Sequence, residues 1–397
     1  MRYPQKIPLG KSKPHLVLEN VGPIRRADVC FSDLTVLVGP QATGKSLFLQ
    51  FLKLVLDHGP ITAGLRNYGL DWNTDTSSFL EVYLGRGMSS VWRSRGKAKS
   101  WLRWQEELVH LDAIVAEKQP GTNYEQCFVI PAQRVLAFSS QSWLRPFSDF
   151  RAGDPFVIRA FSEHLRLQAE PIFETGKDIW RLDDEAYSLL QNSIFGKFDL
   201  TVQTTGVQKE LVLSSGRSRK PLPFMVWSAG QREFVPLLLA LIWLLPASSS
   251  LRKQRCNWVL IEEPEMGLHP KAIAAVLFVI LELLGRGYRV CLSTHSTHVL
   301  DLVWALQVFR KTKARPEALL SIFGVPPRKH SLQLARTVLE KEAAVFYFDD
   351  ESRETQNISS LSPDDADPTV YTWGKLMEFT SRIGDIIAQQ VSQELGD

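Results

Sequence analysis

The segment Gly39-Pro40-Gln41-Ala42-Thr43-Gly44-Lys45-Ser46 decides the fold of this chain. It matches the pattern G-x4-G-K-[ST] in full. The apolar run 34–38 before it predicts a buried strand, and the apolar run 47–56 after it predicts a helix. In that setting the glycines let backbone N–H groups wrap phosphates, Lys45 adds a positive charge and Ser46 offers a hydroxyl to Mg²⁺. We therefore expect every residue of this segment to contribute to a nucleotide-phosphate site.

Two adjacent carboxylates follow a second short apolar run. Val259-Leu260-Ile261 predicts another buried strand, and Glu262 and Glu263 stand at its end. Phosphoryl transfer to water needs one carboxylate near Mg²⁺ and one residue that positions the attacking water. We assign Glu262 to the Mg²⁺ shell and Glu263 to the general base; the alternative is a charged strand end that faces solvent. Glu265 is interpreted as a surface acid without a role.

A serine–glycine–glutamine turn precedes the apolar run Phe234–Leu245, which predicts a buried helix. Its sequence is Ser228-Ala229-Gly230-Gln231. Serine at the cap with glutamine three positions later is also an ordinary helix-capping arrangement. The turn becomes informative through its position, ahead of the two carboxylates and behind the phosphate loop.

The order of these motifs resembles the ABC-class ATPases, including the SMC/RecF group of DNA-associated enzymes. The resemblance implies that Ser228, Gly230 and Gln231 form a signature that contacts ATP held by the opposite subunit. It thus implies a homodimer or higher homo-oligomer with shared sites for ATP and Mg²⁺. It also implies that Gln133, after the predicted strand 128–130, serves catalysis and the metal, with Arg134 as a rival for that position. His295 looks like the switch histidine of the family.

A narrower resemblance is carried by Ile261–Pro270 and Ser293-Thr294-His295-Ser296. These stretches are similar to prokaryotic AAA-family and OLD-type ATPases, many of which belong to anti-phage defence systems. His269 stands where many ABC proteins have an aspartate, so its role is left open. No acidic cluster of the TOPRIM nuclease type follows residue 310, which predicts a separate effector protein, a nuclease or a toxin.

The predicted fold is α/β: an ABC-type ATPase head with a P-loop mixed sheet, helices and a mostly helical insertion. Residues 1–139 would form lobe I with the phosphate loop, and 140–225 the insertion. The signature, carboxylates and His295 would lie in a lobe at 226–310, and 311–397 would form a C-terminal subdomain that packs on the head. Within these units, 79–84 and 345–348 predict strands, 349–368 an acidic loop, and 373–395 a helix.

Composition and charge limit the function classes. The chain has 397 residues, 44% of them hydrophobic and 22% charged, with a formal net charge of +3, which is typical of a soluble globular protein. The polar start of the chain predicts no secretory signal, and the apolar run 234–247 falls short of the roughly 20 residues that span a bilayer. Four separated cysteines predict reduced thiols. We expect a cytoplasmic protein without membrane contact.

Two basic stretches stand out against this near-neutral balance. Residues 86–103 hold six basic side chains and no acid, interleaved with Trp92 and Trp101, and 310–315 hold a second cluster. Mixed arginines and aromatics can contact phosphates and stack on bases of DNA or RNA. An exposed hairpin, a helix end, or contact with an acidic protein would explain them equally.

The leading functional hypothesis is an ATP-hydrolysing sensor or switch, acting in anti-phage defence with a separate effector. One alternative is a RecF/SMC-like ATPase of DNA repair or chromosome maintenance that binds DNA. Another is an ATP-bound scaffold with little turnover that assembles a partner. An ABC transporter subunit is disfavoured, because the insertion does not match a transporter coupling region.

Overall fold

A parallel sheet forms the centre of the computed structural model, which describes residues 13–116, 124–139, 143–174, 184–205, 208–215, 220–245 and 256–394. The six strands are ordered β13-β12-β3-β11-β10-β6, and only the β12–β13 pair is antiparallel. Their bounds are β3 Leu34–Val38, β6 Cys127–Ile130, β10 Trp258–Glu262, β11 Arg289–Ser293, β12 Ala343–Phe348 and β13 Thr355–Asn357. The predicted α/β class is confirmed.

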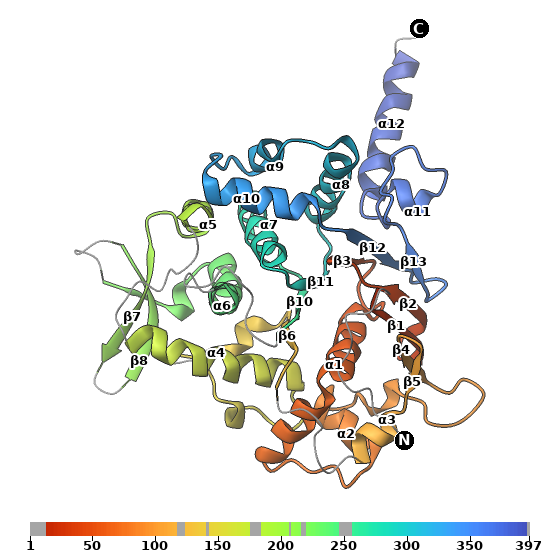
Figure 1. The fold of residues 1–397 in the computed structure, drawn as a ribbon, viewed down its shortest axis with the longest axis vertical. Helices are drawn as coiled ribbons and strands as arrows, with labels where there is room; N and C mark the ends of the chain where they lie inside the picture. Colours follow the sequence, from red (N-terminus) through yellow and green to blue (C-terminus); the bar gives the residue numbers. More distant parts are fainter. Residues whose placement is uncertain are drawn as a thin grey trace.

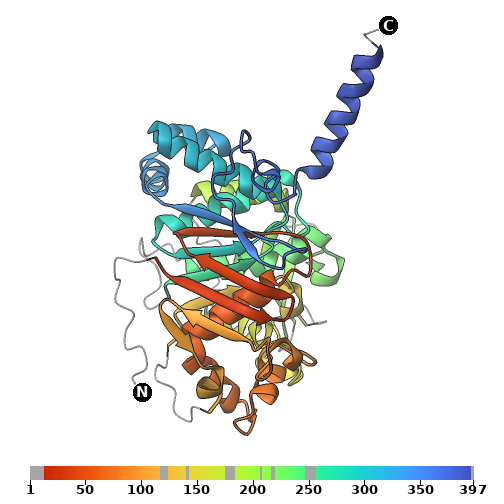
Figure 2. The same cartoon turned by 90° about the vertical axis from the view of Figure 1, so that its right-hand side faces the viewer.

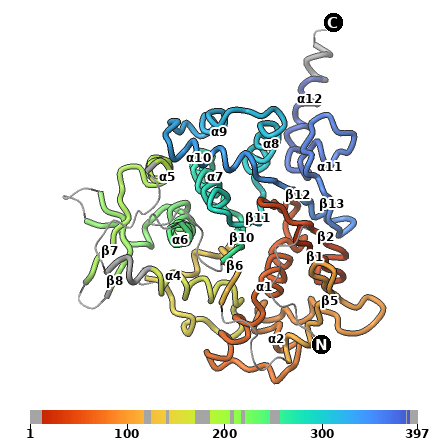
Figure 3. The backbone as a smooth tube through the Cα atoms, viewed as in Figure 1, coloured from red at the N-terminus to blue at the C-terminus, as the bar shows by residue number. Residues whose placement is uncertain are grey.

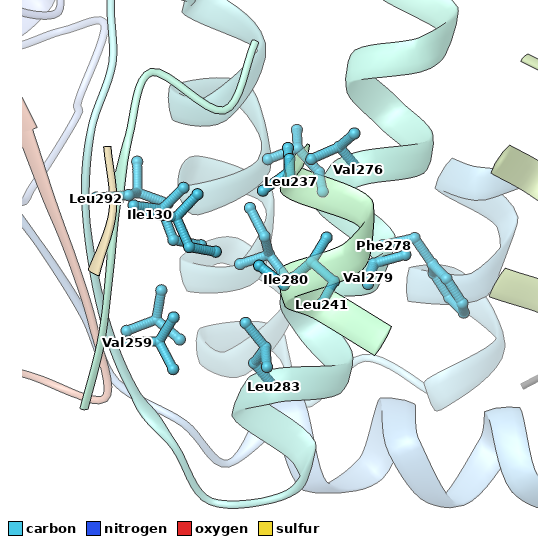
Figure 4. Packing of buried hydrophobic residues seen from close by; sticks show 14 of the residues in the cluster. Ile130, Leu237, Leu241, Val259, Val276, Phe278, Val279, Ile280, Leu283 and Leu292 are labelled. Carbon is cyan, nitrogen blue, oxygen red and sulfur yellow. The ribbon is translucent and has the colours of Figure 1, made fainter. Parts of the chain in front are cut away.

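Side chains of the central strands alternate between two hydrophobic cores, as the period of two in a strand requires. Val259 and Ile261 of β10 enter one core and Leu260 enters the other. On the first side the sheet is covered by α6 Ala229–Leu244 and α7 Pro270–Gly285 (Figure 1). Figure 4 shows Ile130, Val259 and Leu292 of three neighbouring strands facing side chains of these two helices. Because both faces are buried, the strands read as continuous apolar runs.

The second face is covered by α1 Lys45–Asn67 and by an antiparallel sheet of order β2-β1-β4-β5 (Figure 2). Its strands are β1 His15–Val21, β2 Ile24–Cys30, β4 Trp101–Trp104 and β5 Glu107–Val109. Helix α1 runs past its predicted end at 56 through a kink at Asp57, whose φ is −134°. Asp57 accepts hydrogen bonds from Gln126 N, at 2.8 Å, and from the buried Lys53 Nζ, at 2.7 Å, which fastens the kink to the start of β6.

The predicted strand at 79–84 is wrong, because these residues belong to α2 Thr76–Tyr83. Asp75 caps this helix by accepting a hydrogen bond from Ser78 N at 2.7 Å. Phe79 and Tyr83, one turn apart, stack with ring centroids 5.7 Å apart. A cap and an i,i+4 aromatic pair therefore outweigh the strand propensity of the aromatic residues. A single turn, η1 Ser89–Val91, and α3 Leu111–Ala116 complete this part of the chain.

The interval 140–225 is less helical than predicted. It contains α4 Phe156–Glu174 and α5 Asp184–Leu190, both expected from their amphipathic patterns, and the π-type turn η4 Gln191–Phe195. It also contains an antiparallel sheet of order β7-β8-β9, with β7 Asp199–Thr205, β8 Gln208–Ser214 and β9 Leu222–Pro223. Leu200, Leu211 and Leu213 bury this sheet against the first core. Short turns at 134–137, 147–149 and 224–226, termed η2, η3 and η5, connect these elements.

Residues 311–397 do more than pack on the head, because they supply two strands of the central sheet, β12 and β13. After α8 Thr297–Thr312, α9 Pro316–Phe323 and α10 Lys329–Leu339, strand β12 pairs in parallel with β3, and Val345 lies opposite Val36. The predicted acidic loop 349–368 contains β13. Arg353 in this loop donates to Pro23 O at 2.6 Å. The C-terminal segment is therefore integral to the half of the molecule that carries the phosphate loop.

The last helices are α11 Pro368–Tyr371 and α12 Glu378–Glu394. Helix α12 begins later than the predicted 373, since Trp373 is buried with a φ of 53°, and it projects from the body of the molecule (Figures 1 and 3). Leu395, the predicted end, and residues 1–12, on which the leader prediction rested, lie outside the described residues. Among the helices that are described, none has the length and apolar character to cross a membrane.

Candidate nucleotide site

The phosphate loop lies between β3 and α1, as its motif predicts. Gly39, Ala42 and Gly44 have φ angles of 141°, 62° and 101°, so the loop curls through left-handed conformations that turn successive N–H groups inward. Only glycine fits at position 39, because a Cβ there would lie 2.4 Å from the carbonyl oxygen of Phe348 at the end of β12. The Lys45 ammonium donates to Gly39 O at 2.8 Å and to Pro40 O at 2.6 Å.

A cavity of about 310 Å³ opens beside this loop, which is within the range of about 300–1,000 Å³ typical of ligand sites. Its polar wall combines the phosphate loop with Glu263, Ser293 and His295. Its remaining wall consists of loop residues and of Pro23, Leu47, Gln50, Met88 and Val91. The structure thus brings three motifs that are distant in the sequence to one cavity. They contribute Lys45 and Ser46, Glu263, and His295.

Glu263 and His295 follow adjacent parallel strands, so their side chains meet at the carboxyl edge of the sheet. Glu263 Oε1 lies 3.7 Å from His295 Nε2. Burial and the nearby Lys45 charge lower the pKa of His295. Burial also lowers the pKa of Lys45, to about 8, against the opposing effect of Glu263. The cavity therefore favours an anionic ligand, whose negative charge would raise the pKa of Lys45 again.

The side chain of Glu262 lies behind Ser46 with 2% exposure. Burial raises its pKa to about 7, although a hydrogen bond with the Ser46 hydroxyl opposes the shift. Its Oε1 is buried without a hydrogen-bond partner among the described residues. A hydroxyl beside a carboxylate with an unused oxygen is a donor set that suits Mg²⁺, so Ser46 and Glu262 fit the predicted metal role.

Two residues at this site have structural roles that the sequence analysis did not assign. Glu265, interpreted above as a surface acid, accepts hydrogen bonds at 2.7 Å from Thr294 Oγ1 and from the backbone N–H of His295. Arg134, the rival of Gln133, is completely buried and donates to the carbonyl oxygens of Glu233, Glu262 and Glu263. Gln133 itself is exposed and does not line the cavity, so its metal and catalytic assignment stays a prediction.

The signature turn caps α6 and lies apart from the cavity wall. Ser228 Oγ accepts from Gln231 N at 3.3 Å, and Gln231 Oε1 accepts from Ser228 N at 3.1 Å, which is a complete capping box. None of the described residues that line the cavity comes from 228–231. His269, whose role was open, caps α7 by accepting from Lys271 N at 3.3 Å.

Comparison with protein families finds one match, which covers part of the chain. Residues 134–301 match the family described as "AAA domain, putative AbiEii toxin, Type IV TA system". The phosphate loop precedes the matched segment. No curated protein matches the sequence.

Three solved structures similar to this chain are two SMC heads and a transporter subunit. The SMC head domain from Thermotoga maritima has a TM-score of 0.33 and 12% identity, over 73% of this chain and 91% of that chain. An Smc head from Pyrococcus furiosus, bound to the C-terminal domain of ScpA, has a TM-score of 0.37 and 9% identity, over 72% and 91%. An ATP-binding subunit of an ABC transporter has a TM-score of 0.30 and 14% identity, over 75% and 82%.

The parallel sheet and the phosphate loop between β3 and α1 are described above, and the AAA-type match covers the segment that contains Glu262, Glu263 and His295. The chain has a P-loop-type α/β fold, and residues 134–301 are similar to an AAA-type ATPase domain.

Proposed function

We propose that this protein binds ATP with Mg²⁺ at the cavity beside the phosphate loop and hydrolyses it to ADP and phosphate. One observation carries the proposal: Lys45, Ser46, Glu263 and His295 line the same cavity. They are, in order, a phosphate-binding cation, a metal-binding hydroxyl, a general base and a polar group beside that base. Lys45 and Ser46 belong to the phosphate loop, and Glu263 and His295 belong to two further motifs of the sequence.

The geometry supports a division of labour for hydrolysis. Lys45 binds the phosphate oxygens, exchanging its present carbonyl acceptors for them. Glu263 accepts a proton from the attacking water, and His295, 3.7 Å away, orients this carboxylate or the water. Bound Mg²⁺, held by Ser46 and Glu262, would neutralise charge that develops on the phosphates.

The position of the signature supports a site shared between two copies. Ser228 is exposed and Gly230 and Gln231 are partly exposed, while the cavity wall of the same chain contains none of them. The N-terminus of α6 can therefore meet the phosphates of ATP bound to a second copy, since helix N-termini attract anions. ATP would then promote a homodimer or higher oligomer, and hydrolysis would release it.

At the level of the pathway, we infer a cytoplasmic sensor or switch of anti-phage defence, with a nuclease or toxin as the separate effector. The support is the matched family description, which names an AAA domain and a toxin of a Type IV toxin–antitoxin system. The alternative is a scaffold that binds ATP with little turnover. It would have the same ATP site and dimer, and would differ only in a negligible kcat.

The test compares wild-type protein with Lys45→Ala and Glu263→Gln for ATP binding, turnover and mass in solution. We expect Lys45→Ala to lose binding, and Glu263→Gln to bind ATP and accumulate as a dimer without turnover. Wild-type protein that binds ATP but turns none over would favour the scaffold. Absence of ATP binding would contradict the proposal.

A second candidate function, contact with nucleic acid, is favoured by the loop 93–99. All of its residues are exposed, and none of the ion pairs between described residues involves Arg93, Arg95, Lys97 or Lys99. Trp92 is not available for base stacking, because it stacks on Phe51 of α1 with ring centroids 5.7 Å apart. The loop therefore suits the phosphate backbone of duplex DNA rather than unstacked bases.

A charge-neutralised variant tests this candidate. Changing Arg93, Arg95, Lys97 and Lys99 to Gln should abolish binding to a 30-base-pair duplex, whose affinity should fall with a log–log salt slope of about −3 to −4 for four phosphate contacts. The matched control changes four residues of the other basic cluster, Arg310, Lys311, Lys313 and Arg315, to Gln. Equal losses in both variants would indicate only a general charge effect.

A further inference from the structure

A single buried arginine joins the signature helix to the catalytic strand end. Arg134 has 0% exposure. Its Nε donates to Glu233 O, in the first turns of α6, at 2.9 Å. Its two terminal nitrogens donate to Glu262 O at 3.0 Å and to Glu263 O at 3.1 Å. One rigid guanidinium therefore connects two segments of backbone that no shared element joins.

The charge of this guanidinium is balanced by a group of acids around it. Burial lowers the pKa of Arg134, and the carboxylates of Glu233, Glu265, Glu263 and Glu262 oppose that shift. Three of these acids, Glu233, Glu262 and Glu265, each have one buried oxygen that finds no hydrogen-bond partner in the described part of the chain. A buried cation among partly unsatisfied carboxylates is costly to retain for packing alone.

The backbone of Glu263 depends on this contact. Its φ is 44°, a left-handed conformation that a residue with a side chain adopts only under constraint. Its N–H donates to Ser293 O at 2.9 Å, and its C=O accepts from Arg134. The backbone N–H and C=O of Glu263 are thereby both held by hydrogen bonds, and its carboxylate is directed toward His295.

A second contact ties the signature to the same loop. A Cβ on Gly230 would lie 2.8 Å from Gly267 O, and one on Gly267 would lie 3.3 Å from Glu233 Cγ. Consequently α6 and the segment 263–267 touch without a gap, so that a displacement of one is passed to the other.

We propose that Arg134 is a positioning residue that couples the signature helix to Glu263, so that engagement of the signature sets the geometry of the general base. This inference rests on the proposed ATP hydrolysis. Lysine cannot replace arginine in this role, because one ammonium cannot reach three carbonyls of two segments in the planar geometry of a guanidinium.

The first test is Arg134→Lys, with Arg159→Lys as the matched control. Arg159 is 1% exposed and donates to Val82 O, away from the cavity. We expect Arg134→Lys to lower kcat by about 10²-fold with KM for ATP changed less than threefold, because Arg134 does not line the cavity. Arg159→Lys should leave both constants near wild type. Equal kcat losses, or a parallel rise in KM, would overturn the proposal.

The second test does not depend on turnover or on the folding of a variant. In wild-type protein, hydrogen exchange is followed in 229–233 and in 262–267 as a non-hydrolysed ATP analogue is added. We expect exchange to slow in both segments over the same range of analogue concentration. A response in one segment alone would overturn the coupling, whereas wild-type protein without turnover but with a joint response would contradict only the proposed hydrolysis.

Discussion

Glu263 Oε1 lies 3.7 Å from His295 Nε2, and each residue is held in place through its backbone. Glu263 is fixed by Ser293 and Arg134, and the N–H of His295 is fixed by the carboxylate of Glu265. The carboxylate and imidazole face each other because rigid neighbours direct both of them toward the cavity.

Glu263→Gln is expected to lower kcat by about 10²–10⁴-fold, since the amide cannot accept the proton of the attacking water. ATP affinity should stay within about threefold, because Lys45 and the loop N–H groups remain. Steady-state turnover and equilibrium binding measure the two quantities. Glu317→Gln, an exposed acid in the first turn of α9, serves as control, and an equal fall in kcat there would contradict this assignment.

Glu265→Ala should impair turnover through His295. It removes the acceptor of two hydrogen bonds, from Thr294 Oγ1 and His295 N, and leaves those donors unsatisfied at a cost of about 1–3 kcal/mol. We expect urea denaturation to show this loss, together with a fall in kcat. Glu265→Gln keeps one acceptor oxygen and should be milder; a Gln variant as impaired as the Ala variant would indicate that the charge matters instead.

Gly230→Ala is expected to destabilise the folded state by about 1–3 kcal/mol, because its Cβ would meet the carbonyl oxygen of Gly267 at 2.8 Å. Gly64→Ala in α1 provides the matched control, since no atom lies within 4 Å of that Cβ position. The control should stabilise the protein by about 0.5–1 kcal/mol, as alanine favours a helix. Thermal or urea unfolding would separate the two, and a neutral Gly230 variant would refute the tight contact.

ATP binding should take up a proton at Lys45 in mildly alkaline solution. Without nucleotide its pKa is lowered to about 8, and bound phosphates raise it, so the complex holds more protons than the free protein between these pKa values. Affinity should therefore fall as pH rises above about 8. Calorimetry in buffers of different ionisation enthalpy should find uptake of about half a proton at pH 8 and more at pH 9; constant uptake would contradict the shift.

The sequence sufficed for the phosphate loop and the carboxylates because their signals are contiguous. A strand, a turn and a helix follow one another at 34–56, and Glu262 and Glu263 directly end an apolar run. By contrast, the partners of Arg134 are 99 to 129 residues away along the chain, and no local pattern reports such contacts. The adjacent Gln133 therefore appeared to be the better candidate.

Errors in the fold have a similar origin. At 79–84 the residue types favour a strand, and the decisive cap at Asp75 lies outside the apolar run. The sheet at 199–223 is built from strands whose polar threonines and glutamine weaken the alternation. For β12 the apolar run 345–348 was recognised, but its place beside β3 depends on pairing between segments about 300 residues apart.

Because strand β12 lies beside β3, the sheet that carries the phosphate loop is completed late in biosynthesis. All residues that line the cavity have been synthesised once residue 295 is made, yet β3 can then pair only with β11, and its other edge stays open until 343–348 follow. An open strand edge invites mispairing with other chains. Truncation anywhere between His295 and the end of β12 is therefore expected to give an aggregating polypeptide. The shortest unit worth expressing extends through β13 to at least Asn357.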